Sequence, residues 1–363
     1  MSVRLLVGDV FDQLADLPAD SVDCVVTSPP YWGLRDYDVA GQIGLEPTLA
    51  EHLDVMVRVF RAVRRVMKPA GTLWLNYGDC YASTPNGRSA AATKVAGNDD
   101  RTFRDKPFST IGGALKAKDL CMIPNRLAIA LQEDGWWVRS EIIWGKPNPM
   151  PDSSGRYRPS TAHEKIWLLT KSAKSYYDSE SVRMPPAEAS LQRWAQDVES
   201  QQGSARANAG RKTNGNLKAV GGPRSKGNSN GYPGSNKDGV RKRSTTGNVP
   251  NESGSRLLRN YEPDLSAIVP PAVWEIATRG FAGAHFATFP PALVAPCIMA
   301  GCPEGGLVLD PFGGAGTTGL VADRLGRDAI LIELNPDYAE IAERRLTEDA
   351  GMLADVALSE AAE

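Results

Sequence analysis

The sequence predicts an α/β protein whose core is a mostly parallel β-sheet. Apolar runs of strand length alternate with stretches of helical periodicity along most of the 363 residues. Several of the apolar runs end abruptly in polar, proline-rich or glycine-rich corners. Because parallel strands bring their carboxyl ends to one edge of a sheet, we expect these corners to meet and to form the functional site.

Two short strands and a capped helix are expected in the N-terminal part of the chain. Residues 3–7 and 22–27 are apolar runs that each end in a polar tip. Thr48-Leu49-Ala50-Glu51 is a capping box, in which the threonine and glutamate side chains each accept a free amide of the first helical turn. The helix that follows ends before Pro69. Its apolar residues at helical spacing are Leu53, Val57, Phe60, Val63 and Met67.

The rest of the chain repeats the alternation of strand and helix. Further strands are expected over residues 71–76, 136–144, 164–171, 307–310 and 329–333. Further helices are expected over residues 124–133 and 320–325, and Asn335-Pro336-Asp337 begins a last one. The strands at 136–144 and 164–171 are joined by a proline-rich connection.

The first informative corner is Ser28-Pro29-Pro30-Tyr31, which follows the strand at 22–27 and is called the SPPY corner below. Two consecutive prolines donate no backbone hydrogen bond and hold φ near about −65°, so the carbonyls of Ser28 and Pro29 face outward as acceptors. Acceptors beside the flat Tyr31 ring suit a planar group with an amino donor, such as a nucleobase extruded from its stack. A proline-rich turn that only closes a core strand would have the same sequence.

The second corner, residues 311–316, follows the strand at 307–310 and is called the glycine turn below. Gly314, Gly316 and Gly319 fit the pattern G-x-G-x-x-G, and Glu333 ends the next strand. Glycines allow close approach of the backbone to a ligand, and a carboxylate after the second strand can bind ribose hydroxyls. No G-K-[ST] sequence follows, which disfavours a triphosphate-binding P-loop, whereas the glycines alone leave a dinucleotide-dependent dehydrogenase open.

Taken in order, these motifs resemble the β class of amino-group DNA methyltransferases, which use S-adenosylmethionine. In that family a Ser-Pro-Pro-Tyr motif precedes the target-recognition region, and an Asp-Pro-Phe motif with a glycine turn lies near the C-terminus. The resemblance extends to residues 7–11, 71–79 and 285–290. It implies a Rossmann-like methyltransferase fold with permuted motif order and a mostly parallel, seven-stranded sheet. The antiparallel pair near residues 136–171 would form the far edge of that sheet.

The resemblance also assigns site residues. Ser28, Pro29, Pro30 and Tyr31 would be catalytic, and we add Asp79 as a hypothetical proton acceptor that a strand-end cap would explain equally well. Asp310 and the glycine turn would hold the methionine part of the cofactor, Glu333 the ribose, Asp9 and Val10 the adenine, and Thr288 the amino-acid end. The expected cofactor residues are Asp9, Val10, Thr288, Asp310, Pro311, Phe312, Gly313, Gly314, Gly316, Thr317, Thr318 and Glu333. Asp9 also fits a helix cap.

The expected chemistry follows from the weak nucleophilicity of an exocyclic amino group. Its lone pair is delocalised into the ring until acceptors such as Ser28 and the Pro29 carbonyl hold its hydrogens and bend the nitrogen toward tetrahedral geometry. A sulfonium methyl is already activated, so direct transfer needs positioning and charge placement. No cysteine nucleophile is required, and Pro296-Cys297 lies outside the SPPY corner, where we expect it to pack a helix.

The residue at the first catalytic position bears on the target base. Family members with serine there mostly act on cytosine N4, whereas those with aspartate or asparagine mostly act on adenine N6. Ser28 therefore predicts methyl transfer to the N4 amino group of a flipped cytosine in double-stranded DNA. Methylation of adenine N6 remains the close alternative, because either amino group could use these acceptors. A non-catalytic DNA-binding protein with this fold, or a dehydrogenase, would also be compatible with parts of the sequence.

Composition limits the function classes. No apolar run approaches membrane-span length, and Met1-Ser2-Val3-Arg4 leads into a strand rather than a signal peptide, so we expect a cytoplasmic protein without membrane contact. The five cysteines include no C-x-x-C pair and the three histidines are scattered. Neither a disulfide framework nor a metal site is expected from these residues.

The net charge of −2 conceals a basic segment. Residues 186–260 hold thirteen Lys and Arg against five Asp and Glu, an excess of +8 that leaves −10 for the rest of the chain. Residues 203–254 contain almost no apolar side chains, so burial cannot offset the entropy of ordering them. We expect this segment to contact DNA phosphates, although a solvated linker would have the same composition.

Four parts are therefore expected along the chain. They are a catalytic half at residues 1–185 with a basic, DNA-facing loop at about 83–118, a partly flexible target-recognition region at 186–280, a cofactor-binding half at 281–350, and a tail at 351–363. The expected DNA-contacting residues are Arg101, Arg104, Lys106, Arg211, Lys212, Arg241, Lys242 and Arg243. Double-stranded DNA is the expected partner, and the resemblance adds a cognate restriction endonuclease and a homodimer.

Overall fold

The computed structural model describes residues 2–37, 39–84, 107–149, 157–186, 188, 270–278, 289–351 and 355–360. The chain divides into two compact units, one formed by Met1–Val182 with Pro270–Glu363 and the other by Arg183–Val269. Every helix and strand named below belongs to the first unit. None of the helices in the described ranges is both long and apolar enough to span a membrane.

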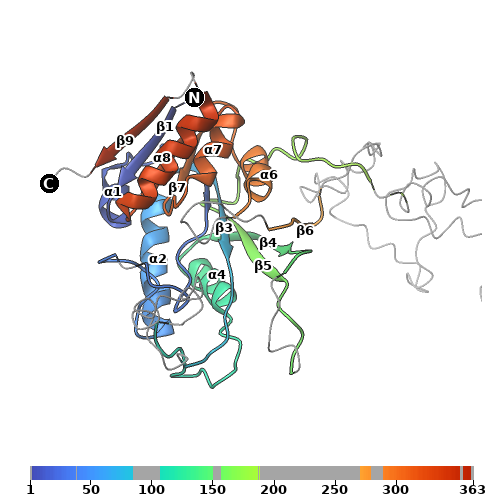
Figure 1. The fold of residues 1–363 in the computed structure, drawn as a ribbon. Coiled ribbons are helices and arrows are strands. Elements are labelled where there is room, and N and C mark those ends of the chain that lie inside the picture. The colour runs from blue at the N-terminus through green and yellow to red at the C-terminus, as the bar shows by residue number, and fades with distance from the viewer. Residues whose placement is uncertain are drawn as a thin grey trace, which may run out of the picture. The chain divides into compact units, whose positions relative to one another are not determined.

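A mixed β-sheet forms the centre of the first unit (Figure 1). Its nine described strands have the order β6-β4-β5-β3-β2-β7-β8-β1-β9. Their bounds are β1 Ser2–Val7, β2 Val22–Thr27, β3 Met67–Tyr77, β4 Trp137–Gly145, β5 His163–Thr170, β6 Val273–Glu275, β7 Leu307–Asp310, β8 Asp328–Glu333 and β9 Asp355–Glu360. Among the described strands β5 alone runs antiparallel to its neighbours, β3 and β4. The predicted fold class, a mostly parallel α/β sheet, is confirmed.

Three details of the predicted sheet need correction. It has nine described strands rather than seven, and the antiparallel strand is not at the edge, because β4 and the three-residue β6 lie beyond it. The segment expected as a tail contains β9, which pairs in parallel with β1 from Ser2↔Asp355 to Val7↔Glu360. The sequence signals of β6 and β9 are weak because each covers an edge and buries little of its own surface. Val356 and Leu358 are the β9 side chains that pack on the core.

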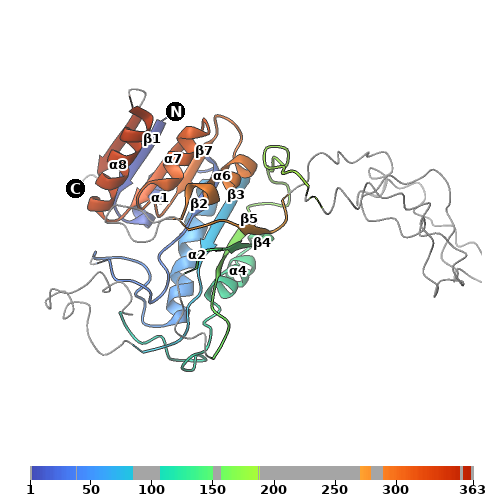
Figure 2. The ribbon, with the colours of Figure 1, turned by 45° about the vertical axis from the view of Figure 1, so that its right-hand side comes forward.

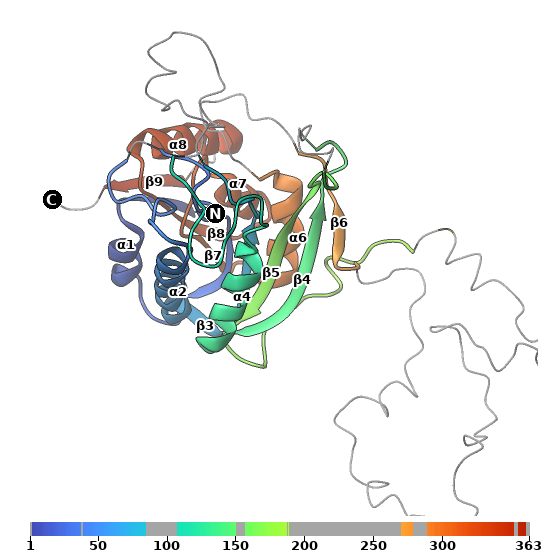
Figure 3. The same cartoon turned by 90° about the horizontal axis from the view of Figure 1, so that it is seen from below.

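Helices cover both faces of the sheet (Figures 2 and 3). Their bounds are α1 Val10–Asp16, α2 Leu49–Val66, α4 Ile123–Glu133, α6 Pro291–Gly301, α7 Thr317–Arg324 and α8 Pro336–Ala350. Helices α1, α2 and α4 share one buried cluster with alternate strand residues such as Val25 and Leu75. Helices α6, α7 and α8 share the other cluster with Val26 and Trp74. This alternation is what a strand buried on both faces requires.

The predicted helix starts are confirmed at two places. At the start of α2 the Thr48 hydroxyl accepts the Glu51 amide at 3.2 Å, and the Glu51 carboxylate accepts the Thr48 amide at 3.1 Å. At the start of α8 the Asn335 side chain accepts the Asp337 amide at 2.9 Å. Strand β3 begins at Met67, four residues before the predicted start at 71, because Pro69 is accommodated at an exposed position where the pairing with β2 shifts register.

The sheet order brings the two informative corners together. β2 pairs directly with β7 through Cys24↔Val308 and Val25↔Leu309. Because the strands are parallel, the SPPY corner after β2 and the glycine turn after β7 leave the same edge of the sheet side by side. The two stretches are 283 residues apart at Thr27 and Asp310, whose side chains are hydrogen-bonded at 2.7 Å.

Candidate functional site

The SPPY corner and the glycine turn face one cavity. It has a volume of about 730 Å³ and is lined by residues at the carboxyl ends of β1, β2, β7 and β8. Cavities of roughly 300–1,000 Å³ are usual for small-molecule sites. The cavity-lining residues that the sequence singled out are Asp9, Val10, Ser28, Pro29, Pro30, Tyr31, Asp310, Pro311, Phe312, Gly313, Gly314, Thr317 and Glu333.

A chain of hydroxyl groups runs through the SPPY corner. The Ser28 hydroxyl donates to the Tyr31 hydroxyl oxygen at 3.2 Å, and the Tyr31 hydroxyl donates to Glu164 Oε2 at 2.9 Å. Burial, and secondly the charge of Glu164, raises the pKa of Tyr31 well above its ordinary value. The phenol therefore stays protonated, so it can accept a hydrogen bond from Ser28 while it donates one to the Glu164 carboxylate.

Three residues at this end of the cavity were not predicted from the sequence. Glu164 accepts Asn76 Nδ2 at 3.2 Å and forms an ion pair with Lys146, and all three residues line the cavity. Asn76 could have been noticed as a polar residue inside the apolar run of β3. Lys146 and Glu164 gave no such signal, since charged residues next to a strand end are common on protein surfaces.

The wall beside Lys146 offers hydrogen-bond donors and an aromatic ring. The Lys146 ammonium lies 4.4 Å from the ring centroid of Trp144, which is itself buried. The Trp144 indole donates to the Ile276 carbonyl at 2.7 Å, and the Thr278 amide donates to the Asn148 side chain at 2.9 Å. These bonds attach the segment after β6 to β4 and to the residues that follow β4, so the wall is built from both.

Asp310 is buried, and both of its carboxylate oxygens are occupied. Oδ1 accepts the Thr27 hydroxyl at 2.7 Å and the Phe312 amide at 3.1 Å, while Oδ2 accepts the Thr318 hydroxyl at 2.7 Å. Burial raises the pKa of Asp310 to about 7 in spite of these hydrogen bonds. Asp310 thus connects β2 to the glycine turn and to α7 at the floor of the cavity.

The glycine turn packs closely on β8 and under Glu333. A side chain at Gly313 would place its Cβ 2.9 Å from Leu331 Cβ, and Gly314 has a φ of +50°, which favours glycine. Glu333 Oε2 accepts the Gly314 amide at 2.8 Å and Oε1 accepts the Asn335 amide at 2.9 Å. Burial raises the pKa of Glu333. A close backbone turn beside a fixed carboxylate is the geometry of a nucleoside site.

Other predicted cofactor residues have additional or different roles. Asp9 lines the cavity and also caps α1, since its carboxylate accepts the Phe11 amide at 2.8 Å. Thr317 lines the cavity and accepts Arg345 Nη1 at 2.9 Å. Gly316 and Thr318 are not among the lining residues, because the first packs against α8 and the second bonds to Asp310.

Asp79 lies at the start of α4 and does not line the cavity. Its Oδ1 accepts the Cys80 amide at 2.9 Å and the Ile123 amide at 3.2 Å. Burial raises its pKa. This is the cap that the sequence offered as the alternative to a proton acceptor. In the described part of the chain, the carboxylate that meets Tyr31 belongs to Glu164.

Several predicted residues lie outside the described residues. They are Thr288, Arg101, Arg104, Lys106, Arg211, Lys212, Arg241, Lys242 and Arg243. Within the described ranges, no group of three or more His, Cys, Asp and Glu residues could hold a metal ion. Cys297 is buried in α6, away from the cavity lining, and burial raises its pKa.

Comparison with known proteins identifies relatives over nearly the whole chain. The sequence profile of the N6/N4 DNA methylase family matches residues 22–344. The Type II methyltransferase M.Cfr9I of Citrobacter freundii is 39% identical over 94% of this chain and 87% of its own. M.XycI of Xanthomonas campestris pv. cyanopsidis is 40% identical with the same coverage, and M.SmaI of Serratia marcescens is 37% identical over 95% and 91%.

Two solved structures share the fold. The cytosine-N4-specific PvuII DNA methyltransferase superposes with a TM-score of 0.55 at 17% identity, over 94% of this chain and 85% of that one. The putative DNA modification methylase TTHA0409 of Thermus thermophilus, complexed with S-adenosyl-L-methionine, has a TM-score of 0.53 at 21% identity over 99% of both chains.

Proposed function

Because the chain belongs to the N6/N4 DNA methylase family, we propose that this S-adenosylmethionine-dependent enzyme methylates the N4 amino group of a cytosine extruded from double-stranded DNA. The observation that carries the proposal is the shared cavity. The SPPY corner and the glycine turn lie at one edge of the sheet because β2 and β7 are hydrogen-bonded neighbours. A methyl donor at the glycine turn and a base at the SPPY corner can therefore come within contact of each other.

The residues of the glycine turn fit S-adenosylmethionine. Gly313 and Gly314 let the backbone approach a ligand closely, and Glu333 is fixed by two amides with carboxylate lone pairs left for ribose hydroxyls. Asp9 and Val10 would line the adenine end, and Asp310 with Phe312 the methionine end. When bound, the cofactor supplies an activated methyl group on a sulfonium centre.

The SPPY corner would orient the target amino group and remove its proton. The Ser28 hydroxyl oxygen and the Pro29 carbonyl accept its two hydrogens and draw its lone pair out of conjugation. After transfer, the released proton can pass from Ser28 through the Tyr31 hydroxyl to Glu164, since those groups are already hydrogen-bonded in that order. No covalent bond to the enzyme is needed.

The choice of cytosine is supported by Ser28 and by hydrogen-bond donors that line the same cavity. On its Watson–Crick edge cytosine presents two acceptors, N3 and O2, next to the N4 amino group, whereas adenine presents only N1 next to N6. Lys146 and Asn148 place ammonium and amide donors in the same cavity as Ser28. A second donor on that edge would favour cytosine, because adenine has a C–H group at the corresponding position.

Nucleoside analysis of methylated DNA tests the proposal. Unmethylated DNA is incubated with the protein and labelled S-adenosylmethionine, digested, and analysed by mass spectrometry. Detection of N4-methylcytosine supports the proposal. Detection of N6-methyladenine instead would show that the enzyme methylates adenine rather than cytosine. Absence of label, with DNA binding retained, would indicate a protein with this fold and no turnover. Ser28→Ala is the active-site control and is expected to abolish the product while cofactor binding is retained.

The relatives named as Type II methyltransferases suggest a biological setting. We propose that the enzyme protects DNA against a cognate restriction endonuclease and that residues 186–280 supply target recognition. A plasmid that has been methylated by the protein should then resist cleavage by endonucleases that recognise one short sequence. A screen of restriction endonucleases on that plasmid identifies the sequence, and uniform sensitivity would contradict this setting. Gel filtration with light scattering tests the homodimer.

A further inference from the structure

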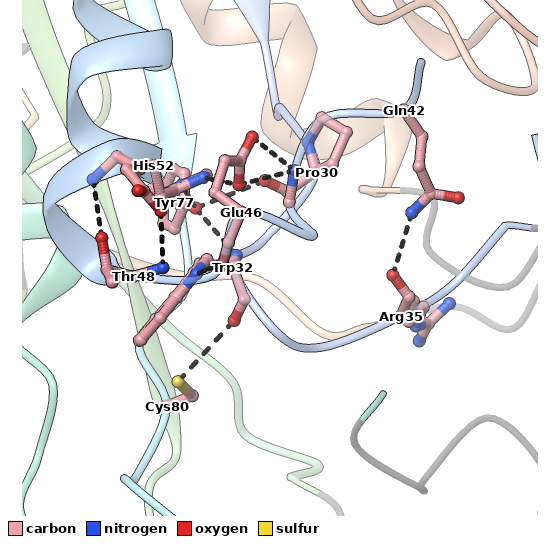
Figure 4. A network of polar contacts seen from close by, with 11 residues as sticks. Pro30, Trp32, Arg35, Gln42, Glu46, Thr48, His52, Tyr77 and Cys80 are labelled. Atoms are coloured by element: carbon pink, nitrogen blue, oxygen red, sulfur yellow. Dashed lines mark hydrogen bonds and ion pairs between the residues drawn. The ribbon is translucent and has the colours of Figure 1, made fainter. Parts of the chain in front are cut away.

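A buried polar network lies directly behind the SPPY corner (Figure 4). It contains Glu46, on the segment before α2, His52 in the first turns of α2, and Tyr77 at the end of β3. His52 and Tyr77 are fully buried, each with 0% of its surface exposed. None of the three residues lines the cavity, and the reaction described above does not use them.

Tyr77 contacts the SPPY corner with both its hydroxyl and its ring. The hydroxyl oxygen accepts the Trp32 amide at 3.1 Å, and the single hydroxyl hydrogen has two acceptors in reach, the Pro30 carbonyl at 3.3 Å and His52 Nε2 at 2.7 Å. The ring stacks on the Tyr31 ring with centroids 4.7 Å apart. One side chain therefore holds the backbone on both sides of Tyr31 and supports the ring of Tyr31 from behind.

Glu46 and His52 hold Tyr77 in turn. His52 Nε2 lies 2.7 Å from the Tyr77 hydroxyl, and His52 Nδ1 lies 2.8 Å from Glu46 Oε2. Burial acts to raise the pKa of Glu46, but the hydrogen bond and charge of His52, with the Gly44 amide, outweigh it and lower the pKa. Glu46 is therefore a carboxylate that only accepts, so Nδ1 carries a hydrogen toward it and Nε2 faces the Tyr77 hydroxyl.

Glu46 also contacts Trp32, the residue after the corner, through its backbone. Its carbonyl accepts the Trp32 indole N–H at 2.9 Å, and its carboxylate accepts the Gly44 amide at about 3.0 Å. The Gly44 carbonyl accepts the Gly33 amide at 2.8 Å. The chain on both sides of Tyr31 is thus attached to the segment before α2 and to β3, while Ser28 and Pro29 line the cavity.

We propose that Glu46, His52 and Tyr77 are positioning residues that fix the SPPY corner from behind, so that Ser28 and Pro29 stay aimed at the target amino group. The proposal rests on the proposed function of that corner. The network need not touch the base or the cofactor. Its effect on the reaction comes from the backbone of Pro30 and Trp32, where a displacement of about 1 Å can cost on the order of 100-fold in rate.

The test is a set of conservative variants assayed for turnover, substrate affinity and stability. Tyr77→Phe keeps the stacked ring and removes the hydroxyl. We expect kcat to fall about 10- to 100-fold, with the cofactor Kd and the KM for DNA within about twofold of the wild type. His52→Gln keeps an amide near the Nε2 position and should retain more activity than His52→Leu, because its amide can still meet Tyr77.

Thr72→Val is the matched control for buried hydrogen bonds. Thr72 lies on the same strand, is 1% exposed, accepts the Trp74 indole at 3.2 Å and donates to the Gly301 carbonyl at 3.0 Å, outside the cavity lining. Thr72→Val should lower the melting temperature about as much as Tyr77→Phe while kcat stays near the wild-type value. Equal kcat in the two variants would overturn the proposal and leave Tyr77 a purely structural residue.

Hydrogen exchange gives a readout that does not depend on activity. Tyr77→Phe removes the acceptor of the Trp32 amide, so exchange in residues 28–34 should accelerate, whereas Thr72→Val should leave it unchanged. Unchanged exchange in Tyr77→Phe would also overturn the proposal. If the wild type methylates adenine instead of cytosine, the proposed function fails but the kinetic test of positioning is unaffected. If the wild type methylates neither base, the exchange result still decides the positioning.

Discussion

Gly78 offers a steric test of the SPPY corner, because a single methyl group added there would meet Tyr31. The Cβ of an alanine at position 78 would lie 2.5 Å from Tyr31 Cε2, 3.2 Å from Cδ2 and 3.3 Å from Cζ. Non-bonded carbons prefer separations of about 3.5–4.0 Å, so the ring has to move by about 1 Å. The φ of Gly78 is not in the left-handed region, so the backbone accepts alanine there without strain.

The ring of Tyr31 has little freedom to accommodate that methyl group. It stacks on Tyr77 at 4.7 Å, and its hydroxyl is bonded to Glu164 at 2.9 Å. We expect Gly78→Ala to break the bond to Glu164 and to lower kcat by about 100-fold, with about 1–3 kcal/mol lost from the free energy of unfolding. The cofactor Kd should not change, since Gly78 does not line the cavity.

The assay is steady-state methylation of a DNA duplex, with calorimetry for cofactor binding and urea unfolding for stability. Gly112→Ala is the control, because a Cβ there has no heavy atom within 4 Å and its φ is not positive. It should behave as the wild type in all three measurements. Normal turnover in Gly78→Ala would refute the assigned role of Tyr31. A loss of cofactor affinity with normal kcat would indicate that Tyr31 contributes to cofactor binding rather than to methyl transfer.

Three further predictions follow from the charges and caps. A cationic ligand favours ionised Asp310, whose pKa is about 7, so affinity for S-adenosylmethionine measured by calorimetry should increase as pH rises through about 7, and Asp310→Asn should remove the increase. Without ligand the sign reverses: because the pKa is raised from 3.8 to about 7 in the folded protein, the contribution of Asp310 to the unfolding free energy falls as pH rises from about 4 to about 7 and is constant above that range. An Asp310→Asn protein that shows the same fall would contradict the assignment. Glu164→Gln keeps the size of the proton acceptor but not its charge, and kcat should fall at least about tenfold with little change in cofactor Kd. Thr48→Ala should cost about 1 kcal/mol in urea unfolding with kcat within about twofold of the wild type, because its capping box is exposed and its residues do not line the cavity.

Local sequence signals predicted the elements that depend on local chemistry. The capping box of α2, the asparagine cap of α8 and the apolar runs of the central strands are all properties of a few neighbouring residues. The two corners were recognisable for the same reason, since consecutive prolines and clustered glycines fix backbone geometry by themselves. The edge strands β6 and β9 carry no such signal, because pairing with β4 and β1 is what makes them strands.

Glu164 shows why one part of the site could not be predicted. In a parallel sheet, functional residues are expected at the carboxyl ends of the strands. β5 runs antiparallel to β3, so its amino end, where Glu164 lies, reaches the same edge as the carboxyl end of β3. A residue at the beginning of a strand thus meets Tyr31 only because of the strand's direction, which depends on pairing between distant segments.

Asp79 and Glu164 both show that sequence position alone does not identify the carboxylate that contacts Tyr31. Asp79 lies two residues after β3 and had the sequence position of a catalytic carboxylate, yet it accepts the Cys80 amide and the Ile123 amide at the start of α4. Glu164 has no distinctive sequence position, yet Tyr31, Asn76 and Lys146 converge on it. A carboxylate that caps a helix has its oxygens committed to fixed amides, whereas one bonded to a hydroxyl and an ammonium can exchange protons through them. The geometry of the partners, rather than position in the sequence, is therefore the reason to propose Glu164 as the proton acceptor.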